Sequence, residues 1–164
     1  MVISYIQKIG WFVGLVLLQV LILNNVHIAG YATPFLYIYL LIKFESAVSR
    51  NELMLWAFSL GLIIDIFSNT PGMNAAAAVF LAFIRPLLLR MFMTRNAEVF
   101  VPGIDSMGFS SFLKYLLTGV WLHHFFLISL EFFSFASLGI VLIRIIASTL
   151  LTTVCLLALE GIRR

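Results

Sequence analysis

The chain has 164 residues, of which 63% are hydrophobic and only 10% are charged, and its formal net charge is +3. Soluble domains carry about 25% charged residues, so this composition argues against a soluble protein and indicates that lipid is the solvent. The apolar runs are continuous and do not alternate with polar residues, which argues against a transmembrane β-barrel. The sequence shows no basic face with aromatic residues for base stacking, which argues against nucleic-acid binding.

Six apolar stretches follow one another along the chain, and each is expected to form a membrane-spanning helix. They are Ile6–Leu23, Pro34–Ile42, Leu53–Phe67, Ala75–Met93, Phe112–Phe133 and Leu138–Leu159. The second reaches a sufficient length only if its helix runs from about Ala29 to Val48, so we expect it to be shielded by neighbours, tilted or partly re-entrant. Because no repeat or low-complexity segment divides the chain, residues 1–164 are expected to form a single polytopic membrane domain.

The basic residues predict the orientation of this bundle. The segments expected on the cytoplasmic side contain Lys8, Lys43, Arg50, Arg90, Arg95, Lys114, Arg163 and Arg164. The segments expected outside, residues 24–33, 68–74 and 134–137, contain no Lys or Arg. Since cytoplasmic loops are enriched in Lys and Arg, the sequence predicts an all-α, six-transmembrane-helix bundle with both termini in the cytoplasm.

One helical hairpin has a distinctive pattern of small and polar residues. Gly61 and Asp65 are four residues apart and therefore share one face of the third predicted helix. Pro71-Gly72 follows in an outer turn and suits type II geometry, and Asn74 is a candidate N-cap for an alanine-rich helix start. Small residues allow helices to approach closely in lipid, so we expect a tightly packed hairpin.

Ionisable residues inside the bilayer are costly, and their partners are therefore informative. Glu131 and Arg144 lie at similar depth on either side of the last outer turn, so we expect an ion pair, either structural or part of a gate or ligand site. Hairpin geometry places Arg85 about 12 Å deeper than the position opposite Asp65. Arg85 is therefore expected to extend towards the cytoplasmic side or to meet another helix, and Arg144 is the candidate partner of Asp65.

His123 and His124 lie near the middle of the fifth predicted helix. Adjacent helical residues point about 100° apart, so these two side chains cannot chelate one metal ion from a single face. We expect hydrogen bonds between helices, with a proton relay or a ligand contact as the alternative. The sequence contains no recognisable catalytic, nucleotide-binding or metal-binding motif, so we expect no catalytic residues, no metal, no cofactor and no enzymatic activity.

The hairpin Gly61–Ala76 resembles the central motif of the rod shape-determining protein MreD family. That motif has a glycine, an aspartate four residues later, and a short turn that ends in glycine and small residues. Gly61, Asp65, Pro71 and Gly72 match it, and the length and hydropathy of the whole chain agree. The resemblance implies that these four residues hold the hairpin in shape.

The resemblance also implies a function and a location. MreD-like proteins are non-enzymatic scaffold subunits of the cell-elongation machinery in the bacterial inner membrane, where peptidoglycan is synthesised. The implied partners are an MreC-like bitopic protein, a RodA-type glycosyltransferase with its penicillin-binding transpeptidase, and indirectly an MreB-like filament. The alternative is a substrate-binding subunit of an energy-coupling-factor vitamin transporter, because MreD is similar to those subunits in architecture.

Overall fold

The computed structural model describes residues 5–26, 32–93, 99–132 and 138–163. Its helices are α1 (Tyr5–Leu21), the 3-10 turn η1 (Leu23–Asn25), α2 (Ile38–Lys43), α3 (Arg50–Ser68), α4 (Met73–Phe92), α5 (Ile104–Met107), α6 (Phe109–Glu131) and α7 (Leu138–Arg163). Five helices, namely α1 with η1, α3, α4, α6 and α7, are long and apolar enough to cross a membrane. The described chain is thus an all-α helical bundle, as expected for a multi-pass membrane protein.

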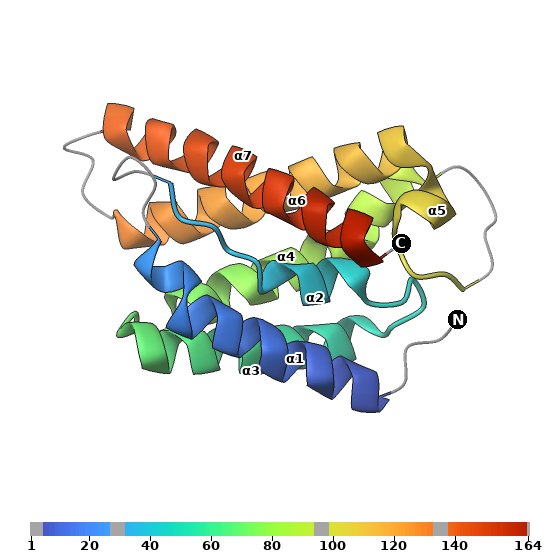
Figure 1. Ribbon diagram of the computed structural model, residues 1–164, viewed down its shortest axis with the longest axis horizontal. Coiled ribbons are helices and arrows are strands. Elements are labelled where there is room, and N and C mark those ends of the chain that lie inside the picture. Colours follow the sequence, from blue (N-terminus) through green and yellow to red (C-terminus); the bar gives the residue numbers. More distant parts are fainter. Residues whose placement is uncertain (1–4, 27–31, 94–98, 133–137, 164) are drawn as a thin grey trace.

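The long helices lie roughly along one direction, and α1 begins at the same end of the bundle at which α7 finishes (Figure 1). Ion pairs confirm which segments meet there: Lys8 lies 3.6 Å from Glu45, and Lys43 lies 2.9 Å from Glu160. We call this end the basic end and the opposite one the far end. Arg95, Arg164 and the expected outer loop 134–137 lie outside the described residues.

The surface of the bundle is apolar where lipid would contact it. On α1, the exposed large residues recur every three or four positions and therefore lie on one face: Ile6, Ile9, Val13, Leu17 and Leu21. Polar side chains such as Gln19, His123 and Thr152 are instead completely buried. This arrangement suits lipid as the solvent, because polar groups must find partners inside the protein.

The second apolar stretch is not the long helix that we expected between Ala29 and Val48. In the described part, residues 32–37 are not helical, and α2 contains only six residues. We call residues 32–43 the broken segment. The segment is shielded by its neighbours, as expected: Tyr37, Ile38 and Leu41 are 0% exposed, and α2 lies between the α1–α3 side and the α6–α7 side of the bundle (Figure 1). Ala29 itself lies outside the described residues.

Side chains from α1 and α7 satisfy the non-helical backbone of the broken segment. Gln19 donates to the carbonyl of Pro34 at 3.0 Å and accepts from the amide of Leu36 at 2.9 Å. On α7, the Ser148 hydroxyl accepts from the amide of Thr33 at 3.2 Å, and the Thr152 hydroxyl accepts from the amide of Phe35 at 3.1 Å. Unpaired backbone groups cost several kcal/mol in hydrocarbon, so these polar residues allow a break inside the bundle.

The substitution Gln19→Leu is expected to lower the free energy of unfolding by about 2 kcal/mol, because it leaves the Leu36 amide and the Pro34 carbonyl without their partner. Gln7→Leu is the matched control, since Gln7 is an exposed glutamine on the same helix. Denaturant titration of both variants in mild detergent measures the difference. Equal stability of the two variants would contradict this role of Gln19.

Candidate functional site

The hairpin that carries the sequence motif is closely packed at Gly61. A Cβ atom on this residue would lie 2.4 Å from Cα of Ala75 and 2.5 Å from its nitrogen, so the helix backbones meet where no side chain fits. Ala75, Ala77 and Ala78 are buried on the facing helix. The prediction of a tightly packed hairpin is confirmed, and Gly61 is the residue that permits this contact.

Asp65 caps the start of α4 from the opposite helix of the hairpin. Its Oδ1 accepts from the Asn74 amide at 3.0 Å and from the Thr70 hydroxyl at 2.8 Å, and its Oδ2 accepts from the Ala75 amide at 2.9 Å. A carboxylate at a helix N-terminus is also favoured by the helix dipole. The prediction that Arg144 pairs with Asp65 is therefore wrong, because among the described residues no ion pair within 4.0 Å joins the two side chains.

The turn has the geometry that Pro71-Gly72 predicts. Gly72 has φ 79° and ψ −3°, the values of the third residue of a type II turn, and the Met73 amide donates to the Thr70 carbonyl at 3.4 Å. Gly72 also precedes the first residue of α4 and has no side chain to cap it. The expected N-cap, Asn74, instead lies inside the first turn, because Asp65 supplies the cap.

Asp65→Asn is expected to lower the free energy of unfolding by about 1–2 kcal/mol. An asparagine keeps the shape of the side chain but replaces one carboxylate oxygen with an NH₂ group. This donor would face a backbone N–H group that now donates to the carboxylate. Glu52→Gln removes the same charge from the first turn of α3 and is expected to change stability by less than about 0.5 kcal/mol. Thermal unfolding of both variants, followed by tryptophan fluorescence, tests this: similar melting temperatures would contradict the capping role.

A buried polar chain connects this hairpin to the broken segment and to α6. Asn74 donates to Asp65 at 3.0 Å, Tyr37 donates to Asn74 Oδ1 at 3.1 Å, and the Tyr37 hydroxyl lies 2.7 Å from His123 Nε2. Nδ1 of His123 is buried and has no hydrogen-bond partner among the residues that the structure describes. If Tyr37 donates to Asn74, His123 must donate through Nε2, which leaves Nδ1 as the unprotonated nitrogen. The sequence pointed to Asp65 and His123, but Tyr37, which joins them through Asn74, was missed.

His124 connects two helices to the broken segment. Its Nδ1 lies 2.8 Å from the Val120 carbonyl, which can only accept, so Nδ1 carries the proton. Nε2 then accepts from the Thr152 hydroxyl at 3.2 Å, and the same hydroxyl accepts from the Phe35 amide. The expected hydrogen bond between helices is present for His124, whose partner Thr152 lies on α7, whereas the partner of His123 is Tyr37 in the non-helical part of the broken segment. No metal-binding group of three or more His, Cys, Asp or Glu side chains occurs in the part of the chain that the structure describes.

Arg85 is buried in the middle of α4, with 2% of its surface exposed, and it meets other elements as expected. Its Nε donates to the Tyr115 hydroxyl of α6 at 3.0 Å. Its terminal nitrogens donate to the carbonyls of Ile42, Phe44 and Glu45, where α2 ends. The last carbonyls of a helix have no partner within that helix, so Arg85 acts as the C-terminal cap of the broken segment.

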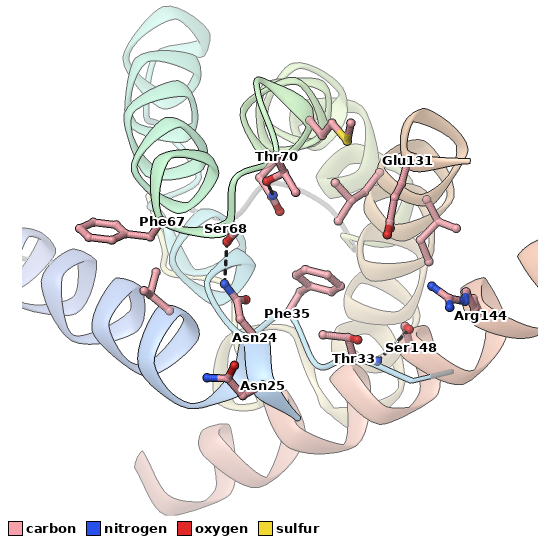
Figure 2. Close-up of a pocket in the computed structure, with 15 residues that line it drawn as sticks. Asn24, Asn25, Thr33, Phe35, Phe67, Ser68, Thr70, Glu131, Arg144 and Ser148 are labelled. Carbon is pink, nitrogen blue, oxygen red and sulfur yellow. Dashed lines mark hydrogen bonds between the residues drawn. The ribbon is translucent and has the colours of Figure 1, made fainter. Parts of the chain in front are cut away.

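Glu131 and Arg144 do not form the expected ion pair. Both residues line one pocket at the far end (Figure 2), but within the described ranges no ion pair within 4.0 Å joins them. The Arg144 guanidinium instead lies 4.7 Å from the centre of the Phe132 ring. Counting from the turn gives the depth of each residue along its helix but leaves open the direction in which the side chain points.

A second polar cluster lies at the basic end and was not predicted. Glu160 accepts from Lys43 at 2.9 Å and from the Tyr39 hydroxyl at 2.7 Å. The loop before α5 lies against this pair: a Cβ on Gly103 would lie 2.7 Å from atoms of both Lys43 and Glu160. The position of Glu160 in the last turns of an apolar helix was the available signal, because a buried carboxylate requires a partner.

Comparison with known proteins assigns no function to this site. The chain matches no protein-family model, no curated protein and no solved structure.

Proposed function

We propose that this protein is a non-enzymatic scaffold subunit of the bacterial cell-elongation machinery. In this proposal it resides in the inner membrane and binds an MreC-like bitopic protein through its membrane helices. The complex positions a RodA-type glycosyltransferase and its transpeptidase, and it connects them to MreB-like filaments in the cytoplasm. The basis for these partners is the resemblance of the hairpin Gly61–Ala76 to the MreD family.

The observation that carries the proposal is the role of the motif residues. Gly61 allows two backbones to touch, Asp65 caps the facing helix, and Gly72 adopts the left-handed conformation that the turn requires. The motif residues thus act on the start of α4 or on the turn that precedes it, and together they fix the shape of the hairpin. A helical bundle with apolar outer faces suits a protein that works by lateral helix packing.

The proposal includes six membrane crossings with both termini on the cytoplasmic side. The broken segment supplies the second crossing, because it runs from Thr33, which lines the pocket at the far end, to Lys43, which pairs with Glu160 at the basic end. Described Lys and Arg residues at the basic end support this orientation: Lys8, Lys43, Arg50, Arg90, Lys114 and Arg163.

A substrate-binding subunit of an energy-coupling-factor transporter is the second candidate. One observation favours it, namely the polar pocket of about 420 Å³ at the far end, which is the outer side in this orientation. Pockets of about 300–1,000 Å³ are typical of small-molecule sites.

Affinity capture of the tagged full-length protein from native membranes, followed by mass spectrometry, separates these candidates. The scaffold proposal predicts recovery of MreC-like and wall-synthase proteins. Val13→Trp on α1 and Ile146→Trp on α7 change two exposed faces without entering the core, and we expect at least one of them to reduce capture tenfold. Recovery of an ATPase pair with a coupling membrane subunit would instead support the transporter candidate.

A further inference from the structure

A pocket of about 420 Å³ opens at the far end of the bundle, where the broken segment, the motif hairpin and the ends of α6 and α7 meet (Figure 2). Thr33 and Phe35 of the broken segment form part of its wall. Asn24 and Ser68 lie across the pocket from Glu131 and Arg144. The scaffold role proposed above makes no use of this cavity.

Most uncharged polar groups around the pocket already have partners. Asn24 donates to the Ser68 hydroxyl at 2.6 Å, and the Ser148 hydroxyl accepts from the Thr33 amide at 3.2 Å. Thr70 donates to Asp65 at 2.8 Å. These groups shape the wall, and the capacity for further strong interactions lies with the two charged residues.

Arg144 has an unused donor in this wall. Its Nε atom is buried and has no hydrogen-bond partner within the described ranges. A guanidinium binds carboxylates and phosphates through parallel N–H donors. In the described part of the chain, no ion pair within 4.0 Å engages this guanidinium, so it can bind an anionic group in the pocket that it lines.

Glu131 adds the opposite charge to the same wall. It is exposed, and among the described residues no ion pair within 4.0 Å engages its carboxylate. Two opposite charges that line one cavity without pairing are complementary to a molecule that carries both signs. A simple anion would use only half of this arrangement, and it would also be repelled by the carboxylate.

We infer that this pocket binds a small zwitterion, whose carboxylate or phosphate contacts Arg144 and whose protonated amine contacts Glu131. Two sources supply this chemistry at a membrane surface: a free amino acid and the headgroup of an ethanolamine phospholipid. The inference rests on the pocket alone, so it stands or fails independently of the scaffold proposal.

The test uses the full-length protein purified in a non-ionic detergent and three soluble probes. Glycerophosphoethanolamine carries a phosphate and an amine, glycerophosphoglycerol carries the same phosphate without the amine, and alanine represents the free amino acids. Calorimetric titration is expected to show saturable binding of glycerophosphoethanolamine or alanine, at least tenfold tighter than any binding of glycerophosphoglycerol. This comparison needs no variant, so it does not depend on how a mutant folds.

Variants then assign the binding to the two charges. Arg144→Gln and Glu131→Gln are each expected to weaken binding at least tenfold, whereas Arg90→Gln and Glu52→Gln, which remove the same charges near the basic end, leave it unchanged. Native mass spectrometry from phosphatidylethanolamine and phosphatidylglycerol nanodiscs identifies the source: selective retention of phosphatidylethanolamine that both pocket variants abolish supports the inference and assigns the lipid. Equal binding of both glycerophosphodiesters, insensitivity to Glu131→Gln, or no saturable binding of any probe or lipid would overturn it.

Discussion

Arg85→Met is expected to lower the free energy of unfolding by about 3–5 kcal/mol. The change removes the donors that reach the carbonyls of Ile42, Phe44 and Glu45 at the end of the broken segment. It also leaves the Tyr115 hydroxyl without its guanidinium partner. Methionine fills much of the same volume, so the measured loss reports the missing hydrogen bonds more than a cavity.

Arg90→Met is the matched control for this result. Arg90 is an exposed arginine on the same helix, near its end, and the substitution removes the same charge. We expect a change of less than about 0.5 kcal/mol. Denaturant titration of both variants in mixed micelles gives the comparison, and an Arg85 variant as stable as the Arg90 variant would show that the cap contributes nothing.

Gly61→Val is expected to destabilise the protein by at least about 3 kcal/mol, because overpacking against a rigid backbone forces the helices apart. The nearest atoms to an added Cβ belong to the backbone of Ala75 and Asn74, and these atoms cannot rotate out of the way. Separation of the helices would also weaken the bonds from Asp65 to the start of α4. We therefore expect a lower melting temperature together with faster proteolysis at the turn near Pro71.

Gly10→Val tests whether the effect is specific to this contact. A Cβ at Gly10 would meet no atom of the described residues within 4 Å, and Gly10 is exposed on α1. We expect its stability to remain within about 0.5 kcal/mol of the unchanged protein. If both glycine variants lose similar stability, the close approach of α3 and α4 at Gly61 is not the cause.

Hydropathy predicted the five long helices well, because each is a continuous apolar run of sufficient length. The same criterion failed for the broken segment. Residues 34–42 are as apolar as a membrane-spanning helix. The partners of the backbone at residues 33–36 lie elsewhere in the sequence, namely Gln19 on one side and Ser148 and Thr152 on the other. The signals available in the sequence were a glutamine within the apolar run of α1 and two hydroxyl residues spaced four positions apart on α7.

The motif hairpin was predicted more completely, since its bonds are local. Gly61, Asp65, Pro71 and Gly72 lie within one turn and two helix ends, where spacing largely fixes geometry. The charge-based prediction for Asp65 failed for a physical reason: an aspartate in a membrane protein does not need a cation when backbone N–H groups at a helix start are within reach. For Glu131 and Arg144, the rotation of each helix about its axis decided the outcome, and spacing from a turn does not determine it.

In the proposed architecture the broken segment is the second membrane crossing, and site-directed labelling tests this crossing directly. In a Cys155→Ala background, single cysteines at Asn25→Cys and Ala47→Cys place exposed thiols on either side of the segment. A membrane-impermeant maleimide added to intact spheroplasts is expected to label Asn25→Cys at once and Ala47→Cys only after permeabilisation. Labelling of both positions from the same side would contradict a crossing between them, and with it the six-crossing architecture.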